Sequence, residues 1–352
     1  MVVAEEAVMR GMNVDSHWKN ESDFLYRRLL GIKRPKENAR VVLGNKEYRF
    51  LRGILRRNDS YSPSTAQVQD TFGYQWSRVS YNKAAHEFQV KWYDDTFPGC
   101  RRFLAKWLQP GASVLDAGCG AGFSALGFLG GHLRNVHYVG VDFSAAVDRA
   151  AHNFSMQKIP GEFMQDDITQ LPFGKETFDV IFSVGVLHHT ESVSNSLRRL
   201  VRHLKTNGRF LLWVFNRQPV IRVFTDDRIR RWLSTLGTEK AYKALRPLTK
   251  LGRAFAEVNA EIKIPEDIPI LDIRAGRYDV HRFIYYFIFK CFYNRSLGMV
   301  RSNIQNFDWF RPKHAHTHTP KEIRAYCRNA NLQIERMWCL PAGISVVAIK
   351  KS

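Results

Sequence analysis

The chain has 352 residues, of which 45% are hydrophobic, so it is long enough for a sizeable globular core with additional segments. Its five cysteines are scattered without a C-x-x-C pair, which argues against a disulfide framework or a zinc knuckle and favours a reducing compartment. The first residues lack a secretory hydrophobic region, and no apolar run is long enough to span a bilayer, so we expect a cytoplasmic protein.

The formal net charge of +20 favours an anionic partner, which would be a nucleic acid, a membrane surface or a phosphorylated substrate. The alternative is a basic surface that only keeps the protein in solution. The basic residues are dispersed along the chain and gather in nothing longer than doublets such as Arg101-Arg102 and Arg230-Arg231.

Two N-terminal segments are expected before the main domain. Residues 1–60 form an accessory segment, in which Val41–Arg57 predicts short strands. Residues 61–110 are expected to be helical, because Phe88–Leu108 has an amphipathic pattern, and Thr71–Tyr81 before it is rich in aromatic residues.

Residues 111–216 predict an α/β domain that begins with a glycine-rich turn. Apolar Val114 and Leu115 lead into Asp116, and three glycines follow at alternate positions: Gly118, Gly120 and Gly122. Such a turn lets the backbone pass close to a ligand at the carboxyl end of a strand. A dinucleotide fingerprint would need a glycine at position 123, which is a phenylalanine.

Further strands and helices alternate after this turn. His137–Asp142 predicts a second strand, and Asp142, about 20 residues after the glycines, is placed to accept hydrogen bonds from ribose hydroxyls. Ser144 is a candidate N-cap for a helix over residues 145–154. The apolar run from Phe178 to Thr190 (F-D-V-I-F-S-V-G-V-L-H-H-T) predicts a central strand that is buried on both faces.

These motifs, in this order, resemble those of the class I S-adenosylmethionine (SAM) methyltransferases, in the broad bacterial family typified by G-x-G-x-G, L-P-F and L-H-H. The resemblance implies a Rossmann-like seven-stranded sheet with an antiparallel terminal hairpin, and SAM as cofactor. It also implies that Asp167, four residues before L-P-F, contacts the adenine, with Asp166 as a second candidate. The expected cofactor-binding residues are Asp116, Gly118, Cys119, Gly120, Gly122, Asp142, Phe143, Asp167, Ile168, Ser183, Tyr74 and Trp76.

The resemblance extends in part to the N-terminal segments. F-G-Y-Q-W, which contains Tyr74 and Trp76, is frequent in similar bacterial enzymes, where it lies near the cofactor as part of a lid. The alternative is ordinary aromatic packing of a lid helix. Tyr48–Arg56 is similar to the last strand of a zinc-ribbon module, but the metal-binding cysteines are missing, so we expect no zinc.

Residues 217–310 depart from the usual fold, because they stand between the fifth strand and the last helix. A structureless loop of this length is improbable, so we expect a helical cap insertion. Its aromatic segment Tyr278–Asn294 predicts a buried helix or, alternatively, an interfacial segment with Arg282, Lys290 and Arg295 at the level of lipid headgroups.

Residues 311–352 are expected to return to the core. Thr319-Pro320-Lys321-Glu322 is a capping box that begins a helix ending near Asn329. Leu332–Trp338 and Ile344–Lys350 predict the two strands of the terminal hairpin.

Candidates for a general base lie in two segments. His188 and His189 follow the fourth strand, where a methyl acceptor must approach, and Asp308 and His318 match a D-W-x-x-P-x-x-x-x-x-H-T pattern of bacterial relatives. The alternating His314, His316 and His318 raise the question of a metal, but no carboxylate or cysteine accompanies them at a ligand spacing, so we expect none.

The sequence therefore predicts a SAM-dependent methyltransferase that acts on an oxygen or nitrogen of a small or medium-sized metabolite, such as a glycan, quinone or lipid-linked intermediate. An anionic substrate and peripheral membrane contact are both open alternatives. A nucleic-acid substrate is less favoured, because Ser183–Val186 stands where enzymes that methylate exocyclic base amines carry D/N-P-P-Y/F. The alternative function is a basic RNA-associated protein or RNA methyltransferase.

Overall fold

The computed structural model describes residues 23–58, 62–79 and 81–351. Five parallel strands form the centre of its main sheet: β4 (Ser113–Ala117), β5 (His137–Asp142), β6 (Glu162–Gln165), β7 (Phe178–Val184) and β8 (Leu204–Phe215). The antiparallel strands β12 (Gly343–Lys350) and β11 (Leu332–Cys339) follow beyond β8 and confirm the predicted terminal hairpin.

The sheet is larger than predicted, because three N-terminal strands extend it. They are β1 (Arg40–Leu43), β2 (Lys46–Leu51) and β3 (Ile54–Arg57), which confirms the short strands expected in this segment. The order in the described part of the chain is β1-β2-β3-β6-β5-β4-β7-β8-β12-β11, so the prediction of seven strands was wrong. Strand β3 pairs in parallel with β6, where a family sheet of seven strands would end.

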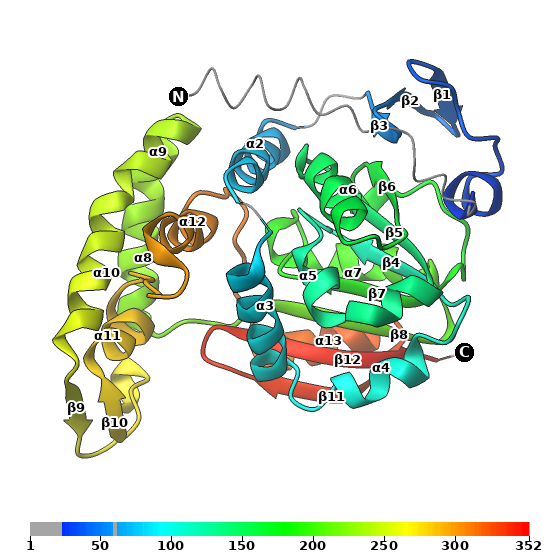
Figure 1. Cartoon of the computed structure of the whole chain (residues 1–352). Helices are drawn as coiled ribbons and strands as arrows, with labels where there is room; N and C mark the ends of the chain where they lie inside the picture. Colours follow the sequence, from blue (N-terminus) through cyan, green and yellow to red (C-terminus); the bar gives the residue numbers. More distant parts are fainter. Residues whose placement is uncertain (1–22, 59–61, 80, 352) are drawn as a thin grey trace.

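Helices cover both faces of the sheet (Figure 1). One core contains residues of α3 (Lys83–Thr96), α4 (Arg101–Trp107), α5 (Phe123–Phe128) and α6 (Ala146–Met156). The other contains residues of the short π-helix η1 (Phe24–Leu29), α7 (Val193–Val201) and α13 (Pro320–Asn329). Neighbouring residues of one strand, such as Val114 and Leu115, point to opposite cores, as strand geometry requires.

Local signals explain most helix boundaries. The predicted capping box is confirmed, since the Thr319 hydroxyl accepts from the Glu322 N–H and the Glu322 carboxylate accepts from the Thr319 N–H. The prediction of Ser144 as the N-cap was wrong, because α6 begins at Ala146 and its N-cap is Ala145. The expected amphipathic segment 88–108 is divided between α3 and α4, with Gly99 at a φ of 70° between them.

The insertion lies beside the sheet and is mostly helical, as expected (Figure 1). Its helices are α8 (Val220–Ser234), α9 (Thr238–Ala244), α10 (Arg246–Val258), α11 (Val280–Phe283), the short π-helix η6 (Ile284–Ile288) and α12 (Gly298–Phe310). It also contains an antiparallel pair that was not predicted, β9 (Glu261–Ile264) and β10 (Gly276–Asp279).

The aromatic segment 278–294 is not one continuous helix. For one of the three residues expected at the level of lipid headgroups, the prediction was wrong. Lys290 is only 6% exposed, so it is not placed to reach a lipid surface. In the part of the chain that the structure describes, no helix has the length and apolar character needed to cross a bilayer.

Candidate functional site

A cavity of about 430 Å³ lies at the carboxyl ends of the central parallel strands. Its floor comes from the segments that follow β4, β5, β6 and β7, which is where ligands bind in doubly wound sheets. Helix α2 (Pro63–Ser77) lies across these strand ends and lines the cavity with Thr65, Val68, Phe72 and Trp76 (Figure 1). The wall toward the insertion and the segment after it includes Asp308 and His314.

The glycine turn after β4 allows the backbone to form this floor. Gly118 has a φ of 93°, and a Cβ there would lie 2.4 Å from the Val186 side chain. A Cβ on Gly120 would lie 3.0 Å from the Trp76 ring. Side chains at these two positions would therefore push into the cavity walls, so glycine is required for packing as well as for conformation.

Asp142 is held at the end of β5 with its carboxylate against the glycine turn. Its Oδ2 accepts from the Gly120 N–H at 2.9 Å, and its Oδ1 accepts from the Ser144 N–H at 2.9 Å and hydroxyl at 2.6 Å. Burial raises the pKa of Asp142, and these hydrogen bonds oppose that shift. Because Oδ2 accepts only one of these bonds, it retains a lone pair for a ligand hydroxyl.

The segment after β6 places one of its two adjacent acids in the cavity. Asp167 and Ile168 line it, and the Asp167 Oδ1 accepts from the Thr169 N–H at 2.8 Å. Asp166, the second adenine candidate, does not line the cavity: it is fully buried and accepts a hydrogen bond from the Tyr48 hydroxyl at 2.7 Å.

Several other predicted site residues lie behind the cavity wall. Asp116 accepts from the Tyr138 hydroxyl at 2.8 Å, and burial raises its pKa to about 7. The Ser183 hydroxyl donates to the Ala117 carbonyl at 2.9 Å. The predicted residues that do not line the cavity are Asp116, Gly122, Ser183, Tyr74, His188 and His318. Those that do are Gly118, Cys119, Gly120, Asp142, Phe143, Asp167, Ile168, Trp76, His189 and Asp308.

Of the two adjacent histidines, only His189 reaches the cavity. Its Nδ1 lies 2.7 Å from the His314 carbonyl oxygen, which can only accept, so Nδ1 carries the proton. Its Nε2 is therefore a free acceptor, and it has no hydrogen-bond partner among the described residues. Burial lowers the pKa of His189 to about 4, while the Asp308 charge acts in the opposite direction.

His188 points away from the cavity and is packed against aromatic rings. It is 1% exposed, its ring centroid lies 3.7 Å from that of Phe215, and burial lowers its pKa well below the usual value. The three alternating histidines line up along the segment before α13, with 5.8 Å and 6.4 Å between successive ring centroids. Within the described ranges, no group of His, Cys, Asp or Glu has the geometry of a metal site.

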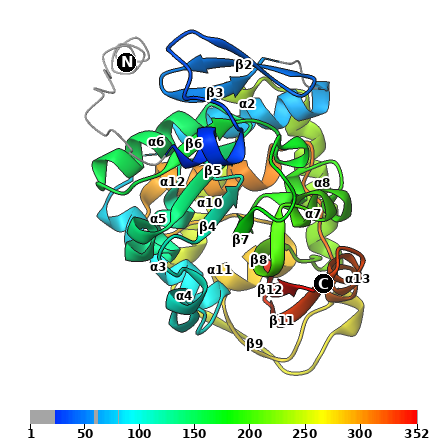
Figure 2. The same ribbon diagram turned by 90° about the vertical axis from the view of Figure 1, so that its right-hand side faces the viewer.

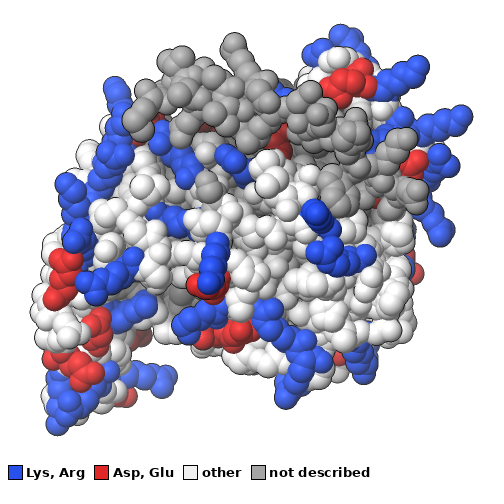
Figure 3. Space-filling model, in the orientation of Figure 1, with Lys and Arg blue, Asp and Glu red and all other residues white. Residues whose placement is uncertain are grey.

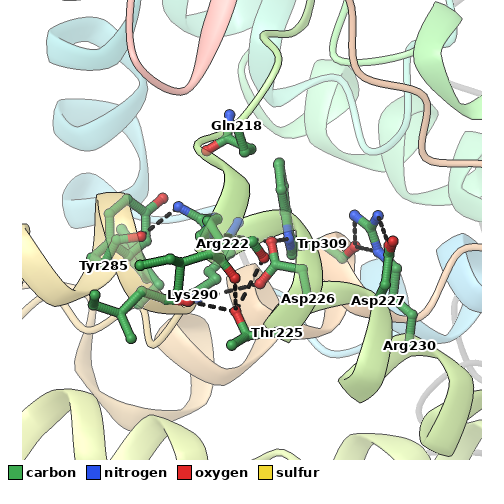
Figure 4. A network of polar contacts seen from close by, with 12 residues as sticks. Gln218, Arg222, Thr225, Asp226, Asp227, Arg230, Tyr285, Lys290 and Trp309 are labelled. Atoms are coloured by element: carbon green, nitrogen blue, oxygen red, sulfur yellow. Dashed lines mark hydrogen bonds and ion pairs between the residues drawn. The ribbon is translucent and has the colours of Figure 1, made fainter. Parts of the chain in front are cut away.

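A buried charged network joins α8, α12 and the segment around Lys290 within the insertion (Figure 4). The Asp226 Oδ2 accepts from the Trp309 Nε1 at 2.6 Å and from the Arg222 Nε at 3.0 Å. The Lys290 ammonium lies 4.6 Å from the centre of the Trp309 ring. Burial lowers the pKa of Lys290 to about 7, against the charge of Asp308.

Sequence reasoning missed some of the cavity wall. Phe72 lies within the aromatic segment that was predicted as a lid, and its ring contacts His189 edge-on at 4.9 Å between centroids. Arg57 and Arg199 line the opposite end, near Asp167. Nothing in their local sequence indicates this, because they come from β3 and α7, which only the folded chain brings together.

Comparison with known proteins identifies the central segment. Residues 115–212 match the family model described as a methyltransferase domain. The chain is 36% identical over 101 residues to the uncharacterized methyltransferase YcgJ of Bacillus subtilis, covering 28% of this chain and 39% of that protein. It is 32% identical over 146 residues to a tRNA U34 carboxymethyltransferase of Shewanella piezotolerans, covering 39% and 41%. It is 34% identical over 113 residues to a wheat phosphoethanolamine N-methyltransferase, covering 32% and 22%. The chain thus spans well under half the length of these relatives.

Solved structures with a similar fold are more distant in sequence. Magnesium protoporphyrin IX methyltransferase of Synechocystis PCC 6803, with bound S-adenosylhomocysteine (SAH), is 16% identical with a TM-score of 0.44 and covers 82% of this chain and 100% of that one. The 1,6-didemethyltoxoflavin N1-methyltransferase of Burkholderia thailandensis is 14% identical with a TM-score of 0.43, covering 90% and 100%.

Proposed function

We propose that the chain is a class I, SAM-dependent methyltransferase, because residues 115–212 match a methyltransferase domain. The protein transfers a methyl group from SAM to an oxygen or nitrogen of a small or medium-sized metabolite. The acceptor classes are glycans, quinones and lipid-linked intermediates. An anionic acceptor would have to carry its charge away from the reacting atom, because Asp308 and Glu191 line the cavity near His189.

One observation carries this proposal: a single cavity joins the residues that we expect to bind the nucleoside to the His189 Nε2, a buried acceptor that has no partner among the described residues. Asp142 and Asp167 lie at one end, where they would hold the ribose and the adenine. His189 and Asp308 lie at the other end, where the acceptor would enter. The glycine turn lies between them and leaves room for the sulfonium portion of SAM.

When bound, SAM supplies a methyl group that the sulfonium already activates, so the protein needs to align the acceptor, exclude water and take up a proton. Helix α2 closes the cavity from above with Phe72 and Trp76. The His189 Nε2 is in the correct tautomer to accept the proton of a hydroxyl or amine, and the Asp308 charge favours the imidazolium that results.

The proposed cofactor site is tested by isothermal calorimetry with SAH. Asp142→Ala removes a carboxylate whose Oδ2 would accept a hydrogen bond from a ribose hydroxyl, worth about 1.5–3 kcal/mol to a charged group, so affinity should fall about 10-fold to 100-fold. Asp95→Ala is the matched control, because that side chain is 62% exposed on α3, away from the cavity. An unchanged SAH affinity of Asp142→Ala would count against the assignment.

The base is tested separately once an acceptor is known. Metabolite profiling of a deletion strain, which seeks a mass difference of one methyl group, would identify that acceptor. His189→Gln should then lower kcat about 10²–10⁴-fold for a hydroxyl acceptor and leave SAH affinity nearly unchanged. His188→Gln is the adjacent control, and an equal loss in both variants would remove His189 from this role.

The charge of +20 favours one alternative, an RNA methyltransferase. Some of the relatives are named as tRNA-modifying enzymes, including a probable tRNA methyltransferase 9B of Homo sapiens. Figure 3, however, shows the lysines and arginines of this face mostly at its margins, over the insertion and near β1–β3, with acidic residues among them. A nucleic-acid footprint is instead a single basic patch or stripe. Tight RNA binding with a steep dependence on salt concentration would favour this alternative over a metabolite.

A further inference from the structure

Strand β3, the last of the three N-terminal strands, ends beside the part of the cavity where the adenine would lie. Figure 2 shows β3 next to β6, and the register pairs Leu55 with Met164 and Arg56 with Gln165. Both strands end at the same edge of the sheet. The segment that follows β6, residues 166–170, is called the adenine-side segment below.

Two donors from β2 and β3 hold the first residue of the adenine-side segment. The Tyr48 hydroxyl donates to the Asp166 Oδ2 at 2.7 Å, and the Arg57 Nη1 lies 3.3 Å from the Asp166 Oδ1. The same Oδ1 accepts from the Asp167 N–H at 2.7 Å. Asp166 is fully buried, so these contacts connect the N-terminal strands directly to the backbone of Asp167 with little competition from water.

The other end of the adenine-side segment is held by the same strands and by α7. The Lys46 ammonium donates to the Gln170 carbonyl, and the Arg57 Nη2 lies 3.3 Å from the Gln170 side-chain oxygen. From the opposite side, the Arg199 Nη1 donates to the Thr169 carbonyl at 3.1 Å. The segment is therefore fixed at both ends, with Asp167 and Ile168 presented to the cavity between them.

Arg56 connects β3 to a second part of the cavity wall. It forms an ion pair with Asp148 of α6 at 2.6 Å and donates to the Gln165 side-chain oxygen at 2.8 Å. The Gln165 amide in turn donates to the carbonyl of Phe143, which lines the cavity. Arg56 and Arg57, which are adjacent in β3, thus connect this strand to the two segments of the cavity wall that come after β5 and after β6.

We propose that the strands β1–β3 are a positioning element for the cofactor, and that Tyr48 and Arg57 set its affinity by holding Asp166. This inference rests on the proposed function, since it takes the adenine of SAM as the group that contacts Asp167 and Ile168. A segment that already has its binding conformation loses less freedom when the ligand binds. Tyr48 and Arg57 lie outside residues 115–212, so the matched domain alone does not contain every residue that determines the cofactor affinity.

Tyr48→Phe tests the proposal in the full-length protein, because it removes one hydroxyl and keeps the ring. SAH affinity, measured by calorimetry, should fall about tenfold, as expected if the competent conformation of the segment drops to about a tenth of the population. Adenosine should lose the same factor, because it carries the same adenine. Tyr26→Phe is the matched control: Tyr26 is buried in the same N-terminal region, but its hydroxyl donates to the Gly53 carbonyl at 3.3 Å.

Hydrogen exchange of the ligand-free proteins separates positioning from general stability. Tyr48→Phe should speed exchange in residues 166–170 more than in the strands themselves, whereas Tyr26→Phe should leave that segment protected. Arg57→Gln removes the second donor and should also weaken SAH binding; because Arg57 itself lines the cavity, faster exchange in residues 166–170 of this ligand-free variant keeps the test decisive if Tyr48→Phe folds poorly. Arg57→Lys retains the charge and should recover part of the affinity.

The outcomes distinguish this inference from the proposed function. A wild-type protein that does not bind SAH would overturn the proposed function. Wild-type binding together with unchanged SAH and adenosine affinity in Tyr48→Phe and Arg57→Gln would overturn the positioning role. Equal losses in Tyr48→Phe and Tyr26→Phe would also overturn it, because they would reduce the effect to stability of the N-terminal region.

Discussion

Asp226→Asn is expected to weaken the packing of α8 against α12 within the insertion. The wild-type carboxylate accepts hydrogen bonds from Arg222 and Trp309 on one oxygen, and both Asp226 and Arg222 are almost fully buried (Figure 4). Asparagine keeps the shape of the side chain but removes its charge. The Arg222 guanidinium would then remain buried without its ion-pair partner.

The size of the effect follows from what remains around Arg222. Removing one partner of a buried ion pair costs about 3–5 kcal/mol. The Arg222 guanidinium still donates to the Tyr285 carbonyl, and it lies 5.1 Å and 5.0 Å from the ring centres of Tyr285 and Trp309. These contacts retain part of the stabilisation, so we expect the lower end, about 3 kcal/mol.

Urea unfolding followed by circular dichroism measures this change. With a slope of about 3 kcal/mol per molar urea, the midpoint should fall by about 1 M. Asp227→Asn is the control, because that side chain is 58% exposed and lies 3.9 Å from the Arg230 guanidinium, a pair worth less than about 1 kcal/mol. SAH affinity should persist in Asp226→Asn, since Asp226 does not line the cavity. Equal midpoints for the two variants would refute this account of the network.

The glycine turn and the buried histidine give two further predictions. Gly118→Ala should lose about 2–5 kcal/mol of unfolding free energy, from its positive φ and the close valine contact, and should also lose SAH binding. Gly131→Ala, with open space at its Cβ, should change stability by less than about 0.5 kcal/mol, and similar urea midpoints would contradict the steric argument. His189 stays neutral in the folded protein down to its pKa of about 4, while an unfolded histidine binds a proton near pH 6.5. The neutral His189 therefore contributes its full stabilisation above pH 6.5. Its contribution to the free energy of unfolding falls by about 3 kcal/mol as the pH drops to 4. Asp116 and Glu162, whose pKa values burial raises to about 7, have the opposite dependence. The measurement is therefore the difference between wild type and His189→Gln across this range, and a constant difference would contradict the tautomer and burial assigned to His189.

Local patterns were sufficient for most of the α/β core. Strand β5 has the predicted bounds, and the capping box of α13 was found from four residues, because strand alternation and caps depend on neighbours in the chain. The glycine turn and Asp142 were also identifiable, since their spacing along one βα unit determines where they lie.

Contacts between distant segments decided what local patterns left open. His188 and His189 are adjacent and chemically identical, yet the closer packing of Phe215 on His188 and the His314 carbonyl beside His189 give them different environments. Likewise, the Tyr48 hydroxyl donates a hydrogen bond to Asp166, which is more than a hundred residues away in the chain, and it is Asp167 that lines the cavity.

The sequence by itself therefore determined the order of strands and helices in the core, because this order follows from periodicity and from residues within single turns. The class of cofactor came from the resemblance of its motifs to those of a known family. Only the tertiary structure decided that the N-terminal strands join the sheet, that Lys290 is buried, and which of two neighbouring acids and histidines face the cavity. The physical reason is that burial and hydrogen-bond partners depend on segments far apart in the chain, which no local pattern records.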